Sequence, residues 1–222
     1  RGRMSTDNWI ACISCHPNAG SDGRDWNFTR VNEGIRNTTD VKGIQDSGAV
    51  HWTANMDELQ DLEFNIRLLQ FGAGLVNGTP NDPFGPPNAG LSQDLDDFAA
   101  FMDSILKPAG RNPNRAPGGG LTPPGARGKG LFESPAAGCT SCHMGSAFTD
   151  SDRGSLIRHD VGTIAPGDVA GQTGFDTPSL LDLFDSAPYL HDGTAPTLLS
   201  VLTVRNPNNQ HGVTSTLTPA QR

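Results

Sequence analysis

Apolar side chains are scarce in this 222-residue sequence. Hydrophobic residues make up 35% of it, only 6% are aromatic, and there is a single tyrosine. It contains 27 glycines and 17 prolines, which favour turns over regular structure. Such a chain buries little apolar surface to offset the conformational entropy that is lost on folding. We therefore expect a large apolar cofactor to supply part of the interior.

Two further absences exclude classes of function. The formal net charge is −8, so the chain lacks the basic face that nucleic-acid binding requires. An acidic surface does permit docking to a basic redox partner protein. No apolar run approaches the ~20 residues that a membrane-spanning helix needs. No export signal is recognisable in the sequence.

The four cysteines all lie in two short motifs, which leaves none for a disulfide. The motifs are Cys12-Ile13-Ser14-Cys15-His16 and Cys139-Thr140-Ser141-Cys142-His143. Cys-x-x-Cys-His is typical of covalent haem c attachment, in which two thiols add to the haem vinyl groups and the histidine binds iron. The sequence thus predicts two haem c groups, attached at Cys12, Cys15, Cys139 and Cys142, with His16 and His143 as proximal iron ligands.

Zinc binding and dithiol chemistry are the alternative interpretations of the cysteine pairs. Two pairs that share one zinc ion are usually ~15–20 residues apart, and here more than a hundred residues separate them. Neither alternative explains a histidine directly after each pair. Haem attachment is therefore the favoured interpretation.

The apolar pattern predicts an all-α fold of two cytochrome c-like haem domains with long loops. Helices are expected near residues 9–16, over 56–71 and 92–106, from 125 to 132 and over 197–204. A Pro/Gly-rich linker, residues 107–125, separates an N-terminal haem domain (1–106) from a C-terminal one (126–222). A weak internal repeat, in which an Asp-Ser pair precedes His51 and His191, indicates duplication. We expect the first domain to be truncated at its start and the second at its end, so that the chain is part of a longer protein.

Motifs in the second half resemble those of the bacterial dihaem cytochrome c peroxidase and MauG-like family. They are Arg127-Gly128-Lys129-Gly130-Leu131-Phe132, Ala147-Phe148-Thr149-Asp150, His159-Asp160-Val161-Gly162-Thr163 and Ala187-Pro188-Tyr189-Leu190-His191-Asp192-Gly193. The resemblance implies that Trp52 carries electrons between the haems, although a core tryptophan beside a haem would look the same. It also implies a calcium ion held by Asn37, Ser186 and Pro188, and a periplasmic or extracellular location.

The ligand opposite each proximal histidine decides between conduction and catalysis, because six-coordinate iron is closed to substrate. His211 is the expected distal ligand of haem 2, with His191 as its rival. His51 and Met56 are the candidates at haem 1, whereas Met102 is expected to pack in the core. The glutamate that such peroxidases use as an acid–base is absent downstream of Trp52, where Gln70 lies.

Electron transfer between the two haems is therefore the favoured function, with a redox protein as partner. The alternative is a peroxidase or oxygen-activating oxidoreductase with an open N-terminal haem, for which peroxide is a candidate oxidant. A third interpretation is a structural module in which the covalently attached haems serve only to hold the fold together.

Overall fold

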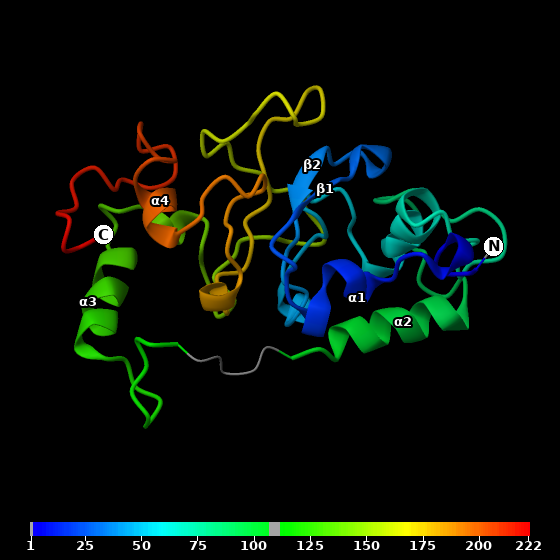
Figure 1. The fold of residues 1–222 in the computed structure, drawn as a ribbon, viewed down its shortest axis with the longest axis horizontal. Coiled ribbons are helices and arrows are strands. Elements are labelled where there is room, and N and C mark those ends of the chain that lie inside the picture. The colour runs from blue at the N-terminus through cyan, green and yellow to red at the C-terminus, as the bar shows by residue number, and fades with distance from the viewer. Residues whose placement is uncertain (1, 107–111) are drawn as a thin grey trace.

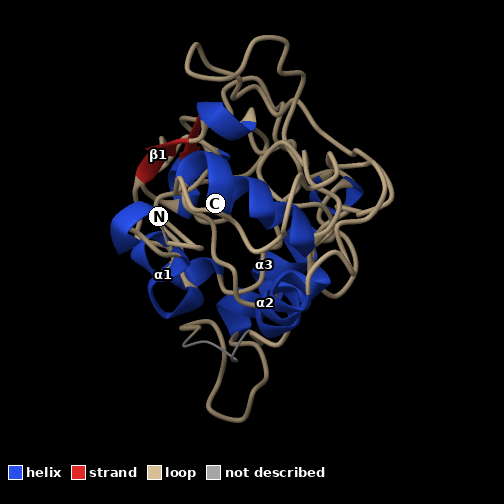
Figure 2. Cartoon of the chain, turned by 90° about the vertical axis from the view of Figure 1, so that its right-hand side faces the viewer, coloured by secondary structure: helices blue, strands red, loops and turns tan. Residues whose placement is uncertain are grey.

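A computed structural model describes residues 2–106 and 112–222. Loops dominate both halves, as Figure 2 shows. The α-helices are α1 (Cys12–Cys15), α2 (Gln93–Asp103), α3 (Pro123–Phe132) and α4 (Leu198–Leu202). Two strands, β1 (Asp25–Asn27) and β2 (Ile35–Asn37), form an antiparallel pair in the middle of the molecule (Figure 1). Short 3-10 turns occupy Thr6–Asn8, Pro17–Ala19, Thr29–Val31, Ile44–Asp46, Leu59–Leu62, Cys139–Ser141 and Leu183–Asp185.

The expected all-α class is wrong. Helices of every kind make up only 27% of the structure, and the β1–β2 pair is a genuine hairpin with Trp26 opposite Arg36. Its strands are only three residues long, too short for a period-two pattern to emerge from the sequence. The turn between them places Asn32 and Gly34 in the left-handed region. A β-carbon on Gly34 would lie 2.8 Å from the Gly167 carbonyl oxygen, so the hairpin also needs glycine for this close approach.

Helix α2 fulfils its sequence prediction most closely. Its buried residues Leu95, Ala99 and Met102 recur at the spacing of one helical face. Acidic residues in its first turn suit the positive end of the helix dipole. The helix expected over residues 56–71 is shorter and irregular: Leu59–Leu62 form a 3-10 turn, Glu63 and Phe64 keep helical backbone angles, and Asn65–Leu69 are π-helical.

The expected linker lies only partly within the described residues, since residues 107–111 fall outside them. Its last residues already belong to α3, which begins at Pro123. Thr122 caps this helix by accepting a hydrogen bond from the Gly125 amide, and proline suits the first helical position. Helices α3 and α4 lie at the opposite end of the molecule from the N-terminus (Figure 1).

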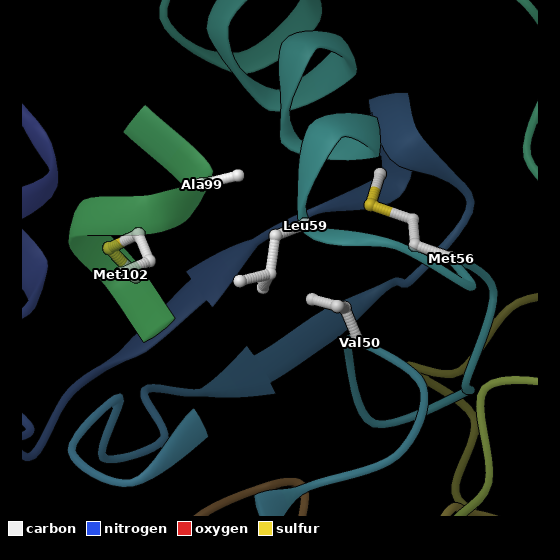
Figure 3. Close-up of a cluster of buried hydrophobic side chains, with 5 residues drawn as sticks. All are labelled: Val50, Met56, Leu59, Ala99 and Met102. Atoms are coloured by element: carbon white, nitrogen blue, oxygen red, sulfur yellow. The ribbon is translucent and has the colours of Figure 1, made fainter. Parts of the chain in front are cut away.

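Both hydrophobic clusters of the described residues lie in the first half. One joins residues from the loop after β2 to α2 and is drawn in Figure 3: Val50, Met56, Leu59, Ala99 and Met102. The other contains Ile66, Leu75, Val76 and Leu95. The described part of the second half forms no such cluster, and its buried apolar residues are mainly alanines beside Phe175. The buried side chains of the second half are therefore mainly polar or small.

Buried ion pairs join the two halves. Arg36 lies 2.8 Å from Glu33 in its own half and 2.5 Å from Asp168 in the other, and all three side chains are at most 4% exposed. Lys42 similarly bridges Asp40 and Asp182. The division into two haem domains stays a prediction. None of the described helices has the length and apolar character to span a membrane.

Candidate haem sites

The two Cys-x-x-Cys-His motifs fold into short helical turns that place both thiols and the histidine together. The first motif forms α1 and the second the 3-10 turn Cys139–Ser141. All four cysteines are free and partly buried. Burial raises the pKa of each thiol, and that of Cys15 reaches about 11 with a further contribution from Asp22. A reactive dithiol requires a lowered thiol pKa instead, so these pairs do not resemble redox-active dithiols.

Both proximal histidines present one free ring nitrogen. The Nδ1 atom of His16 lies 2.9 Å from the Thr39 carbonyl oxygen, and Nδ1 of His143 lies 3.0 Å from that of Phe148. Each Nδ1–H thus donates to a carbonyl, which leaves Nε2 as the lone pair that can bind iron. Burial lowers the pKa of both imidazoles, so that both are held in the neutral form that iron binding needs. These residues therefore fit the axial role expected of them.

His211 faces His143 although 68 positions separate them in the sequence. Their ring centres are 6.2 Å apart and their planes are inclined by 32°. Burial, and then His143, lowers the pKa of His211 to about 4. The structure thus brings these two sequence-predicted ligands together. The rival, His191, instead stacks on Phe175 at 3.7 Å and lies edge-on to Trp52 at 6.4 Å.

Asn206 fixes the segment that carries His211, and sequence reasoning missed it. Its Oδ1 accepts the His211 amide at 2.9 Å. Its Nδ2 donates to the carbonyl oxygens of His211 and Gly212 and to the Thr214 hydroxyl, at 3.0, 2.8 and 3.0 Å. Asn206 is 5% exposed. An asparagine two residues from the Asn-Asn-Gln-His run looks like an ordinary turn residue, so the sequence carries no signal of this role.

His51 has both ring nitrogens engaged. Asn65 donates to its Nε2 at 2.9 Å, so the proton sits on Nδ1 and is donated to the Asn55 amide oxygen at 2.8 Å. Met56, the other candidate at haem 1, is buried in the hydrophobic cluster together with Met102 (Figure 3). Gln70 is nearer to the first haem motif, because its side chain hydrogen-bonds to Cys12. Its Oε1 is buried and has no hydrogen-bond partner.

Trp52 lies where the two halves meet. Its indole Nε1 donates to the Asn37 carbonyl at 2.9 Å, and its own carbonyl accepts the Asp176 amide at 2.8 Å. With His191 at its edge, the ring contacts side chains that come from the second half. This position is compatible both with a route for electrons and with a purely structural role.

Two of the three residues expected to bind calcium, Asn37 and Pro188, lie beside the segment that leads into and begins β1. The Asn37 side chain is buried, and its Nδ2 donates to Asp25 at 3.3 Å, which leaves Oδ1 as the atom that could bind a cation. A β-carbon on Gly23, in the same loop, would lie 3.4 Å from the Ala187 carbonyl oxygen and 3.6 Å from Pro188. The Ser186 hydroxyl donates to the Leu183 carbonyl, so its own carbonyl is the group that remains for a cation.

Two known proteins are similar to this chain in sequence. It is 32% identical over 146 residues to the hydrazine synthase subunit gamma of Kuenenia stuttgartiensis, which covers 48% of this chain and 40% of that subunit. It is 43% identical over 82 residues to the methylamine utilization protein MauG of Methylorubrum extorquens, which covers 34% of this chain and 23% of MauG. The matches therefore span less than half of either relative. No family model matches the chain.

Two solved structures share the fold. The Kuenenia stuttgartiensis hydrazine synthase pressurised with xenon superposes with a TM-score of 0.69 at 24% identity, over 98% of this chain and 79% of that one. A MauG-like protein associated with microbial copper homeostasis gives 0.58 at 21% identity, over 90% and 68%. The sequence similarities confirm the resemblance to MauG-like proteins that the motifs predicted, and the structural ones show a shared fold.

Proposed function

We propose that the chain is a dihaem c-type cytochrome that transfers electrons, with haem 2 closed by His143 and His211. The 6.2 Å between the two ring centres carries this proposal. Two imidazoles on opposite sides of one iron have ring centres roughly 6.3 Å apart, because each metal–nitrogen bond is about 2 Å and the nitrogen lies about 1.1 Å from its ring centre. Aromatic rings in direct contact also lie about 4.5–7 Å apart, so the distance supports the proposal together with the place of His143 in the haem motif and the burial of both imidazoles.

Axial histidines on both faces leave no position for substrate, so haem 2 conducts electrons and binds no oxidant. Haem supplies the one-electron chemistry when it is bound. The polypeptide keeps both imidazoles partly buried, which favours their neutral form. Trp52 is the proposed route toward haem 1, because it contacts residues of both halves.

The spin state of the ferric protein tests this assignment. Wild-type haem 2 should be low-spin, and a His211→Ala variant should turn it high-spin, with added imidazole restoring the low-spin spectrum. His191→Phe is the matched control, since it removes the rival histidine and keeps a ring to stack on Phe175. Persistence of the low-spin signal in His211→Ala would show that another residue binds the iron.

An open haem 1 is the second candidate function, and the hydrogen bonds of His51 favour it. Asn65 and Asn55 occupy both ring nitrogens of His51, and Met56 is packed in the core, so neither is free to close haem 1. The chain would then be a peroxidase or oxygen-activating oxidoreductase at that haem. Cyanide or carbon monoxide should change the spectrum of one haem and leave the other unaltered. A protein that binds neither would be a pure electron carrier.

Calcium and the cellular setting complete the proposal. Asn37 Oδ1 with the carbonyl oxygens of Ser186 and Pro188 would offer a hard cation the oxygen ligands that it prefers. Chelation should then lower the thermal stability, and calcium should restore it.

We place the protein outside the cytoplasm with a redox protein as partner, because covalent haem attachment is normally completed after export.

A further inference from the structure

Two buried carboxylates near the second haem motif take no part in the proposal so far. Asp176 is 9% exposed, and its Oδ2 accepts a hydrogen bond from the Ser151 hydroxyl at 2.7 Å. Asp150 lies 2.7 Å from His159 Nε2 through its own Oδ2. In both residues the other oxygen, Oδ1, is buried without a hydrogen-bond partner. A buried charge is costly unless its oxygens are satisfied, so the pair is poorly suited to carry two negative charges.

Asp150 and Asp176 together extend from the expected edge of haem 2 to Trp52. Ligand atoms of Cys142, Asp150 and His159 all lie within 4.8 Å of one another. Because the Cys142 sulfur would form a thioether, these three residues are not a metal site, and the Asp150–His159 pair lies beside the haem instead. At the other end, the Asp176 amide donates to the Trp52 carbonyl at 2.8 Å. The His159 side chain is 34% exposed and so connects Asp150 to solvent.

The surroundings of Asp176 favour its protonated and its ionised form almost equally near neutral pH. Burial, and then the negative charge of Asp150, raises the pKa of Asp176 to about 7, while hydrogen bonds from Ser151 and from the Thr177 backbone, and the charge of Arg158, lower it. Arg158 itself donates to the Thr53 carbonyl and interacts with the buried Glu33. A small change in nearby charge is therefore enough to shift the protonation of Asp176 near neutral pH.

We propose that Asp176 takes up a proton when haem 2 is reduced. One electron from a one-electron donor protein converts ferric to ferrous iron, and the Asp176 carboxylate binds one proton from solvent to become a neutral carboxylic acid. Reduction removes one positive charge from the haem, which makes two adjacent carboxylates harder to keep ionised. The uptake of a proton with the electron restores the local charge. This inference rests on the proposed function, because it requires haem 2 at Cys142.

The test is a spectroelectrochemical titration of haem 2 in the intact haem-loaded protein, from about pH 5.5 to about pH 8.5, a range that brackets the relevant pKa. The wild-type midpoint potential should fall as the pH rises through about 7, since the proton then becomes harder to acquire. An Asp176→Asn variant should lose this slope. The control is Asp160→Asn, which removes an exposed carboxylate next to His159 and should keep the slope.

Either of two results would overturn the inference. One is a wild-type midpoint potential that does not vary with pH, which needs no variant to fold. The other is a slope that survives in Asp176→Asn. Infrared difference spectra of the wild type give an independent measurement, because reduction should produce the carbonyl band of a protonated carboxyl. A low-spin haem 2 with a flat titration would reject this inference alone, whereas a high-spin haem 2 would reject its bis-histidine closure.

Discussion

Replacing Asn206 by alanine should loosen the proposed distal ligand without touching the iron. Asn206 has two amide hydrogens for three acceptors, and its Oδ1 takes one further hydrogen bond, so at most three bonds form at once. At about 1 kcal/mol net for each, the variant should lose about 2–3 kcal/mol from the segment that holds His211. That corresponds to about a 30- to 150-fold increase in the ratio of unligated to ligated His211.

The assay is the ferric absorption and electron paramagnetic resonance spectrum of Asn206→Ala, with thermal unfolding measured in parallel. We expect a high-spin component that grows on warming, together with a lower melting temperature. Asn209→Ala is the control, because Asn209 accepts the Thr214 and Ser215 amides on the same loop and makes no bond to His211. A variant with wild-type spin state and wild-type melting temperature would refute the view that Asn206 positions the ligand.

Three further predictions concern the route of electrons, pH and stability. Trp52→Phe should slow electron transfer between the haems in stopped-flow reduction if the indole is the route, whereas an unchanged rate with reduced stability would leave only a packing role. Burial lowers the pKa of His211 in the folded protein from 6.5 to about 4, so on acidification the unfolded chain binds this proton first. The free energy of unfolding should therefore decrease from about pH 6.5 to about pH 4 and remain low below that. Denaturant titrations should show a smaller decrease in His211→Phe. Arg36→Met should lower the free energy of unfolding by about 3–5 kcal/mol in the same titrations, because it leaves Glu33 and Asp168 as buried charges without their arginine. A decrease below about 1 kcal/mol would contradict this account.

The candidate haem residues were predicted from local sequence signals, and the structure brings His143 and His211 together, but their roles stay predictions. The Cys-x-x-Cys-His spacing predicts the attachment residues because its two thiols can add to the haem vinyl groups. His211 is the predicted distal ligand because few other strong iron ligands lie in its region. Helix α2 was predictable because its apolar residues recur on one helical face, which is a local signal. The family resemblance was confirmed because its motifs are short, specific and in the correct order.

What the sequence could not provide depends on contacts between distant residues. The expected helix over 56–71 changes from 3-10 to π-helical on either side of the buried Glu63, which accepts the amides of Leu75 and Val76, a contact that no local pattern reveals. The β1–β2 hairpin is stabilised by pairing and by the approach of Gly167, not by strand-forming composition. The engagement of His51 by Asn55 and Asn65 likewise required the structure, because asparagines in such positions usually indicate turns.

The Arg36–Asp168 pair has a consequence for anyone who wishes to dissect the molecule. Each half carries its own haem motif, so severing the chain between α2 and α3 looks like a simple way to obtain two single-haem pieces. Such a cut would separate Arg36 from Asp168, so that Arg36 keeps only Glu33 and the buried Asp168 loses its arginine. Separately expressed halves should therefore be poorly soluble alone, and should recover when they are produced together.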